Sequence, residues 1–286
     1  MALRMLNSTY SYLLNQQQAV TLKGYHAIGH NAKANILPYL TGSQSFDEKV
    51  YLWEQFAEEG YLTAYAEDFS NFSSKNEQFR SSLQHMDYYF KSFLSVAETV
   101  GNCDSTGNER HQNLLESLNK FLSLHKANNY LAWWYSHESP SLEQIYHADP
   151  DYMNYFKREF EKGTFKNTLV VIGSSYGARY TQLKTTVTEQ FLPLHLLVFP
   201  QWFKKHYKQL YATFQSNAEN SLTSGFDMHK TLLDVLNLDS AAVPNKQKEG
   251  TKGQSLFRTI LHSRTCEQAG IIKELCVCDQ DKLTTQ

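Results

Sequence analysis

The chain has 286 residues, a length that suits one large domain or two small ones. Hydrophobic residues make up 41% of it and charged residues 20%, a balance that is typical of globular proteins and excludes extended disorder. The 27 lysine and arginine residues nearly balance 29 acidic residues, so the net charge is -2. Because there is no basic excess, the composition predicts no nucleic-acid partner and no attraction to an anionic membrane surface.

The most apolar stretch, Phe191 to Pro200, contains His195 and two prolines. It is much shorter than the about 20 residues that a membrane-spanning helix needs, so we expect no membrane-spanning segment. The N-terminal residues contain no apolar run as long as that of a secretory signal.

Short apolar runs rich in β-branched and aromatic residues predict five buried strands. In chain order they are Tyr25–Ile28, Tyr61–Ala66, Tyr130–Tyr135, Thr168–Ile172 and His195–Phe199. Apolar residues at helical spacing predict covering helices between them. These are Phe46–Glu59, Asn113–His125 and Asp151–Lys162, the last ending at a left-handed cap on Gly163. Alternating strands and helices predict an α/β fold, with a mostly parallel, mixed central sheet sandwiched by helices.

Three polar stretches have structural interpretations. Asp149 and Asp151 flank Pro150 and predict a helix start, where the helix dipole favours acidic residues. The stretch Ala242–Gln254 contains proline and glycine and predicts a surface loop. A short basic cluster predicts a solvated helix face and consists of Lys204, Lys205, His206 and Lys208.

The clearest junction between a strand and a loop runs from Asn167 to Arg179, where Ser174, Ser175, Tyr176 and Gly177 follow the predicted strand. In parallel α/β sheets, ligands bind beyond the carboxyl ends of the strands. Alone, this junction predicts only a tight turn after a buried strand.

Six further segments accompany this junction. They are GYHAIGHNAKANILPYLTG (24–42), GYLTAYAED (60–68), WWYSHESPS (133–141), SLTSGFDMHKTLLDVL (221–236), GQSLF (253–257) and RTCEQAGIIKELCVC (264–278). In this order and spacing, the chain resembles a family of sulfatase-like proteins of unknown function from nematodes and insects, within the alkaline phosphatase and sulfatase superfamily. The resemblance covers nearly the whole chain. It implies one partial sulfatase-like domain over residues 1–286, with residues 264–286 as a cysteine-containing C-terminal extension.

The resemblance also implies where a metal would bind. In the superfamily, the strand corresponding to Thr168–Ile172 runs into Ser-Asp-His-Gly, whose Asp and His bind a catalytic divalent cation, zinc or calcium. Ser175 and Tyr176 stand at those two positions here. A serine hydroxyl and a protonated phenol are poor replacements for a carboxylate and an imidazole. We therefore expect this chain to bind no metal cofactor.

The family pattern extends further at both ends. The resemblance implies an upstream strand with a metal-binding Asp and a Ser, Thr or Cys nucleophile, and a continuation beyond the Cys-x-Cys motif. On this basis the sequence is expected to be the central part of a longer protein, with a sheet incomplete at both ends.

Two functions remain open at this point. The leading hypothesis is a sulfatase-like domain that has lost its metal site and nucleophile and acts as a non-catalytic binding or structural protein. The alternative is a divalent-metal-dependent hydrolase of phosphate or sulfate esters whose catalytic segment is missing from this chain.

Three further residues are candidates for lining a pocket. Asp227 is interpreted as the N-cap of a helix, with or without a role that faces the site, and His229 follows it. His137 follows a predicted strand and could contact a substrate or lie in an exposed loop.

Family resemblance implies an extracellular or secretory-pathway protein. Two glycosylation sequons, at Asn7 and Asn71, are compatible with export. In an exported protein, Cys266 is expected to pair with Cys276 or Cys278, which are close in sequence and follow the Arg-Thr-Cys-x-x-Ala-Gly pattern. The alternative is four reduced thiols in an intracellular protein.

Overall fold

The structure, a computed structural model, describes residues 6–44, 50–67, 77–90, 103, 107–136, 142–177, 187–242 and 252–277. The chain divides into two compact units. The first unit comprises Met1–Ser45 and Phe165–Gln286, and the second comprises Phe46–Thr164. Each unit is described separately below.

The first unit holds a three-stranded sheet in the order β1-β6-β5. Its strands are β1 (Val20–Thr21), β5 (Val170–Gly173) and β6 (His195–Val198), and both pairings are antiparallel. All four residues of β6 are buried, as the sequence predicts for a core strand. β6 is therefore the middle strand of this sheet, and β5 is an outer one.

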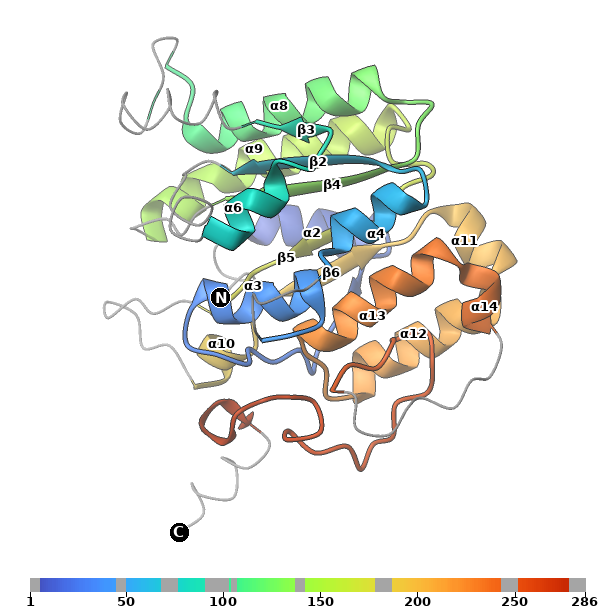
Figure 1. The fold of residues 1–286 in the computed structure, drawn as a ribbon. Helices are drawn as coiled ribbons and strands as arrows, with labels where there is room; N and C mark the ends of the chain where they lie inside the picture. The colour runs from blue at the N-terminus through green and yellow to red at the C-terminus, as the bar shows by residue number, and fades with distance from the viewer. Residues whose placement is uncertain are drawn as a thin grey trace. The chain divides into compact units, whose positions relative to one another are not determined.

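Helices of the first unit alternate with these strands along the chain (Figure 1). They are α2 (Asn7–Asn15), α3 (Ala32–Thr41), α10 (Val187–Phe191), α11 (Gln201–His206), α12 (Lys208–Asn220), α13 (Gly225–Leu236), α14 (Leu238–Ala242) and the short 3-10 helix η1 (Lys273–Leu275). α3 and α13 lie side by side and make extensive contact. In the basic cluster, Lys205, His206 and Lys208 are exposed and Lys204 is half-buried, so the predicted solvated face is largely confirmed.

The predicted strand Tyr25–Ile28 is wrong. Tyr25 makes only an isolated bridge to Thr223. The Oδ1 atom of the buried Asn35 accepts hydrogen bonds from the backbone N–H groups of Ile28 (2.7 Å) and Gly29 (3.0 Å). Because a side chain satisfies these backbone donors, the apolar run is buried without joining a sheet.

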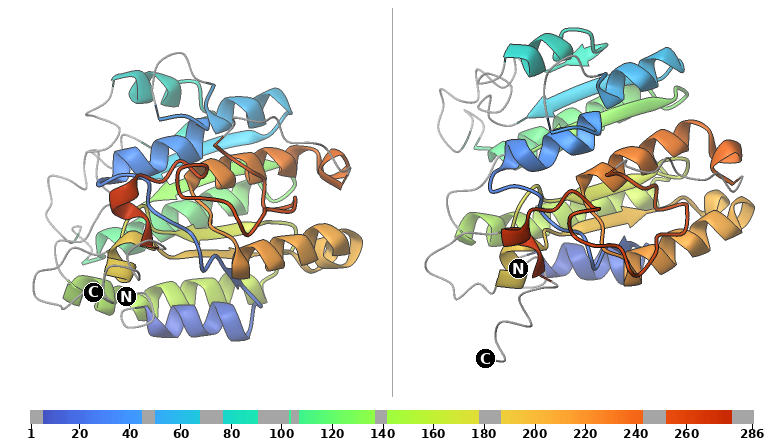
Figure 2. Two further views of the ribbon diagram at one scale, coloured as in Figure 1. Left: turned by 90° about the horizontal axis from the view of Figure 1, so that it is seen from below. Right: turned by 60° about the horizontal axis from the view of Figure 1, so that its bottom comes forward.

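Residues 252–277 form an irregular segment that lies across α12 and α13 (Figure 2). Asn217 of α12 donates hydrogen bonds to the carbonyl oxygens of Leu256 (2.9 Å) and Arg258 (2.7 Å). Thr231 of α13 accepts one from the N–H of Leu256 (2.9 Å). Side chains of the two helices thus replace the backbone pairing that this segment lacks. Most of the predicted loop Ala242–Gln254 lies outside the described residues.

The second unit holds a parallel three-stranded sheet in the order β3-β2-β4. Its strands are β2 (Leu62–Glu67), β3 (Tyr88–Tyr89) and β4 (Tyr130–Tyr135). Its helices are α4 (Leu52–Glu58), α6 (Glu77–Leu83), α8 (Arg110–Leu124) and α9 (Leu142–Glu161). The predicted strands Tyr61–Ala66 and Tyr130–Tyr135 correspond to β2 and β4, whose bounds they match within one residue. Strands alternate with helices in both units, which confirms the predicted α/β fold, and the strand pairings are parallel in this unit and antiparallel in the first.

All three predicted helices begin at other residues than expected, and α8 begins at Arg110, three residues before the predicted Asn113. α4 begins at Leu52, because Tyr51 is its N-cap and the backbone N–H of Tyr51 donates to Glu54 (2.8 Å). α9 begins at Leu142 and continues through Pro150, so Asp149 and Asp151 lie inside the helix. Burial of Ala148, Tyr155 and Phe156 outweighs the hydrogen bond that the proline removes.

Asp151 connects two helices of the second unit and does not cap one. Its carboxylate accepts hydrogen bonds from Nε2 of His111 (2.8 Å) and Nε2 of Gln112 (2.9 Å), both on α8. Gly163 ends α9 with a φ of 73°, which confirms the predicted left-handed cap. Among the described helices, none is long and apolar enough to cross a membrane.

Candidate functional site

The loop after β5 is fixed by backbone hydrogen bonds. The N–H of Ser174 donates to the carbonyl of Leu194 (2.8 Å), and the N–H of Gly177 donates to that of Gln190 (3.0 Å). A Cβ at Gly177 would lie 2.0 Å from the carbonyl oxygen of Glu189, so this position requires glycine. The loop is therefore a tight turn held against α10.

Ser175 and Tyr176, at the predicted metal-ligand positions, are half-buried. The hydroxyl of Ser174 donates to the carbonyl of Tyr176 (2.5 Å). The Tyr176 ring packs against Phe191, with 6.4 Å between ring centroids, and against a buried apolar cluster. This cluster consists of Ala27, Ile28, Phe226, Cys266, Ala269, Ile271, Leu275 and Cys276. Tyr176 thus contributes to apolar packing at the end of β5.

These two side chains do not fit a divalent cation. Protein sites hold zinc or calcium with carboxylates, imidazoles, thiolates or several oxygen ligands. Ser175 supplies a neutral hydroxyl, and the Tyr176 ring is engaged with the apolar cluster. Within the residues that the structure describes, no three His, Cys, Asp or Glu side chains gather where they could hold a metal ion.

Asp227 lies in the first turn of α13, but Ser224 is the N-cap. The backbone N–H of Ser224 donates to Oδ2 of Asp227 (2.8 Å), and the two residues form a capping box. Asp227 therefore helps to cap α13, as predicted, but from the third position of the helix and not from the N-cap position. Asp227 has no exposed surface.

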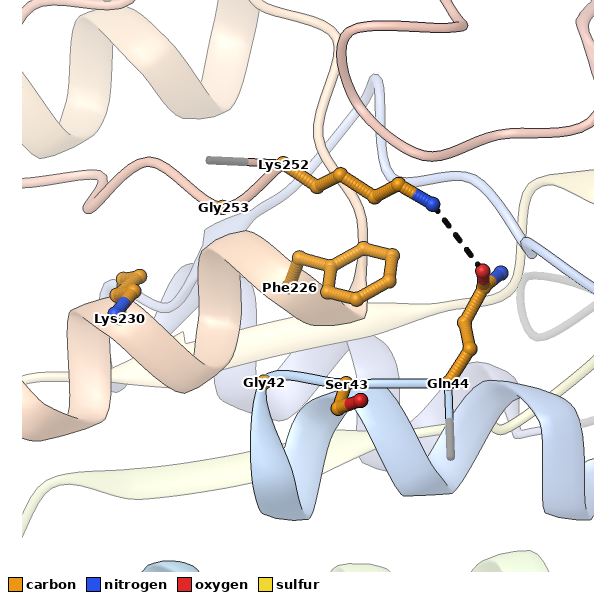
Figure 3. Close-up of a pocket in the computed structure, with 7 residues that line it drawn as sticks. All are labelled: Gly42, Ser43, Gln44, Phe226, Lys230, Lys252 and Gly253. Carbon is orange, nitrogen blue, oxygen red and sulfur yellow. Dashed lines mark hydrogen bonds between the residues drawn. The ribbon is translucent and has the colours of Figure 1, made fainter. Parts of the chain in front are cut away.

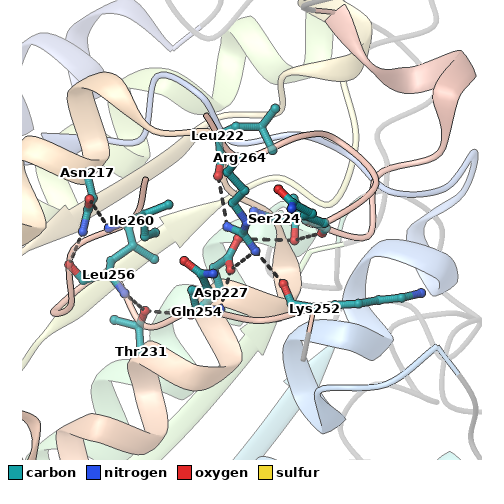
Figure 4. A network of polar contacts seen from close by, with 12 residues as sticks. Asn217, Leu222, Ser224, Asp227, Thr231, Lys252, Gln254, Leu256, Ile260 and Arg264 are labelled. Carbon is teal, nitrogen blue, oxygen red and sulfur yellow. Dashed lines mark hydrogen bonds and ion pairs between the residues drawn. The ribbon is translucent and has the colours of Figure 1, made fainter. Parts of the chain in front are cut away.

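Asp227 also forms a buried ion pair (Figure 4). Nη2 of Arg264 lies 2.8 Å from Oδ1 of Asp227, and the backbone N–H of Gln254 donates to the same oxygen (2.7 Å). Arg264 further donates to the carbonyls of Leu222 and Lys252. Burial raises the pKa of the Asp227 carboxyl, and Arg264 opposes that shift. The pair joins α13 to the 252–277 segment.

His229, one of the predicted pocket residues, is buried with 4% of its surface exposed. Nδ1 of its ring lies 3.0 Å from the carbonyl oxygen of Tyr39 in α3, to which it donates. Burial lowers the pKa of His229 to about 4, so the ring is neutral at pH 7. Its described role is to connect α13 with α3. His137, the third predicted pocket residue, lies outside the described residues.

His195 on β6 is buried and stacks on Tyr25, with 3.6 Å between ring centroids. Burial lowers the pKa of His195 from 6.5 to about 3. The folded state therefore resists protonation of this ring. Stability from this group is complete above pH 6.5 and falls as the pH decreases toward 3, because only the unfolded chain takes up the proton.

The free energy of unfolding is expected to fall as the pH decreases from 7 to 5, in part because of His195. In His195→Phe this fall should be smaller than in the wild type by about 2 kcal/mol. Phenylalanine retains an aromatic ring beside Tyr25 and removes the titrating group. Urea unfolding at both pH values measures the difference. Equal losses in the variant and the wild type would contradict the assignment.

Cys266 and Cys276 form a disulfide, 10 residues apart in sequence. This is one of the two predicted pairings, and Cys278 lies outside the described residues. Both bonded cysteines are buried in the apolar cluster beside Phe226. Cys103 is free and exposed. The disulfide thus anchors the segment that carries Arg264.

Glu67, a buried carboxylate of the second unit, was not among the residues predicted to form a site. Glu67 is the last residue of β2, is 1% exposed, and accepts a hydrogen bond from the Tyr65 hydroxyl (3.1 Å). One sequence signal could have identified Glu67. It ends a predicted strand within the segment GYLTAYAED, and ligands of parallel sheets bind at such strand ends.

A pocket of about 480 Å³ lies in the first unit (Figure 3). It is lined by Gly42, Ser43, Gln44, Phe226, Lys230, Lys252 and Gly253. Among the described residues, none of the predicted site residues lines it. The pocket has no local sequence signal, because its lining comes from three separate segments, 42–44, 226–230 and 252–253.

All 286 residues match a protein family described as a protein of unknown function, DUF229. The chain belongs to this family. No curated protein matches the DUF229 chain significantly.

Several solved structures are similar to the DUF229 chain. The soluble domain of lipooligosaccharide phosphoethanolamine transferase A from Neisseria meningitidis has a TM-score of 0.55 and 13% identity, over 80% of both chains. A protein in the alkaline phosphatase superfamily from Vibrio parahaemolyticus has a TM-score of 0.53 and 13% identity, over 80% of this chain and 63% of its own. A phosphonate monoester hydrolase from Silicibacter pomeroyi has a TM-score of 0.52 and 11% identity, over 89% of this chain and 71% of its own. These similarities confirm the predicted alkaline phosphatase/sulfatase-like fold.

Proposed function

We propose that this chain is a sulfatase-like domain without a metal site at the end of β5, and that it acts as a non-catalytic binding or structural protein. The observation that carries the proposal is the chemistry of Ser175 and Tyr176. Neither is a good ligand for a divalent cation, and the Tyr176 ring packs in the apolar cluster that also holds Phe226.

The surrounding polar residues support this proposal. The carboxylate of Asp227 is already compensated by Arg264 at 2.8 Å and by two backbone N–H groups. The ring of His229 donates to a carbonyl of α3. Both side chains therefore serve packing between elements, and drawing either toward a metal would leave a buried group without its partner.

The alternative is a divalent-metal-dependent hydrolase of phosphate or sulfate esters. Two observations favour it: the fold is shared with a phosphonate monoester hydrolase, and Glu67 places a buried carboxylate at the end of β2. We place it second because ligands in this superfamily are expected at the positions of Ser175 and Tyr176.

Binding of a divalent metal separates the two functions. We expect the purified chain to bind no stoichiometric zinc or calcium in calorimetric titrations, and to leave 4-nitrophenyl phosphate and 4-nitrophenyl sulfate unchanged. Ser175→Asp with Tyr176→His supplies a carboxylate and an imidazole, and should raise zinc affinity at least tenfold.

The matched control is Ser175→Asn with Tyr176→Phe, which changes the same positions without adding a good ligand. It should bind zinc no better than the wild type. One tightly bound zinc or calcium ion per wild-type chain would overturn the proposal in favour of the alternative.

We further propose that the protein is exported and glycosylated. The Cys266–Cys276 disulfide supports an oxidising compartment, and Asn7 is exposed at the start of α2. Asn71 lies outside the described residues. Mass spectrometry of non-reduced peptides from the native source tests this. Free thiols at Cys266 and Cys276 with an unmodified Asn7 would contradict export.

A further inference from the structure

Two lysines and no acidic residue are among the described residues that line the pocket of the first unit. Lys230 and Lys252 are exposed at its rim. Within the described residues, neither lysine forms an ion pair. Nζ of Lys252 donates to Oε1 of Gln44 (3.2 Å) and lies 5.6 Å from the centroid of the Phe226 ring. The whole chain has a net charge of -2, so the positive charge of these two lysines is local, and it favours an anionic ligand at the pocket.

The backbone that carries Lys252 is held in place. The carbonyl of Lys252 accepts a hydrogen bond from Arg264, which is itself fixed by the buried pair with Asp227. At Gly253, a Cβ would lie 2.5 Å from the carbonyl oxygen of Phe226, so the segment packs directly on α13. The next residue is also bound to α13, because the N–H of Gln254 donates a hydrogen bond to Oδ1 of Asp227.

The opposite rim is held equally well. Lys230 follows Phe226 by one turn of α13, so the helix sets its position. Gly42 ends α3 with a φ of 66°, and its N–H donates to the carbonyl of Pro38 (2.9 Å). Ser43 and Gln44 then line the pocket with a hydroxyl and an amide. Charged and polar donors thus face one cavity from ordered backbone, an arrangement that lowers the entropic cost of binding.

We propose that this pocket binds a small molecule that carries an oxyanion. The carboxylate, phosphate or sulfate takes the place of Gln44 at Nζ of Lys252, and Lys230 adds positive charge at the other side of Phe226 (Figure 3). Ser43 and Gln44 supply further donors. The site uses other residues than the loop after β5, so the proposal goes beyond the function proposed above and holds whether or not that loop binds metal.

Calorimetric titration at low ionic strength with EDTA present tests the proposal. The probes are phenyl phosphate, phenyl sulfate, benzoate and neutral phenol. We expect at least one anionic probe to bind at least tenfold more tightly than phenol, and its affinity to fall with added salt. Comparing the three anions identifies which oxyanion the pocket prefers.

The decisive variant is Lys230→Gln with Lys252→Gln, which should weaken binding of the preferred anion at least tenfold. Lys205→Gln with Lys208→Gln is the matched control, since it removes the same charge from exposed positions on α11 and α12 of the same unit. It should change the affinity less than twofold. Equal weakening by both variants, binding that survives Lys230→Gln with Lys252→Gln, or no preference over phenol would overturn the proposal. Because EDTA excludes metal, none of these outcomes bears on the metal test.

Discussion

Replacing Arg264 by leucine is expected to lower the free energy of unfolding by about 3 to 5 kcal/mol. The substitution leaves the fully buried carboxylate of Asp227 without its cationic partner. It also removes donors from the carbonyls of Leu222 and Lys252. Urea unfolding at pH 7 measures the change.

The matched control is Arg258→Leu. Arg258 lies in the same 252–277 segment as Arg264. It forms an ion pair at 3.4 Å with Asp234, which lies in α13 as Asp227 does, but both side chains are partly exposed. We expect that substitution to cost about 1 kcal/mol or less. If the two substitutions lowered the free energy of unfolding by similar amounts, burial of the Asp227–Arg264 pair would not be the cause of the loss.

A double variant keeps this prediction testable if Arg264→Leu fails to fold. Asp227→Asn with Arg264→Leu removes the isolated buried charge and is expected to be more stable than Arg264→Leu alone. A double variant less stable than the single one would contradict the assignment of the cost to an uncompensated carboxylate.

Removal of the disulfide is expected to have the second largest effect. Cys266→Ser with Cys276→Ser should lower the free energy of unfolding by about 2 to 3 kcal/mol, because it frees a loop closed over a separation of 10 residues. Both sulfur atoms also lie in the apolar cluster, where serine hydroxyls would need new partners.

Chemical denaturation of oxidised and reduced protein measures the same quantity independently. Reduction of the wild type should reproduce most of the loss, and it should have no effect on the double serine variant. Cys103→Ser is the control, since Cys103 is free and exposed, and it should change stability by less than about 0.5 kcal/mol. A control loss as large as that of the double variant would contradict a stabilising disulfide.

Elements with local signals were predictable from the amino-acid sequence. Tyr130–Tyr135 is a strand with the predicted bounds, and α8 carries the predicted apolar face, with Leu114, Phe121 and Leu122 buried. Helical periodicity and runs of β-forming residues report the burial of one face, which depends on neighbours a few positions away. The order of seven segments likewise pointed to the superfamily whose fold the structure has.

Contacts between groups that are far apart in the sequence were not predictable and are found only in the folded chain. Asp227 was interpretable as a cap, but its buried partner Arg264 lies 37 positions away. The run Tyr25–Ile28 is typical of a strand, yet the N–H of Ile28 donates to the Asn35 side chain, and those of His26 and Ala27 donate to carbonyls far away in the sequence. The pocket around Lys230 and Lys252 depends on three segments converging. A buried charge or backbone donor takes whichever partner the chain path brings within hydrogen-bonding distance, and local spacing carries no record of that path.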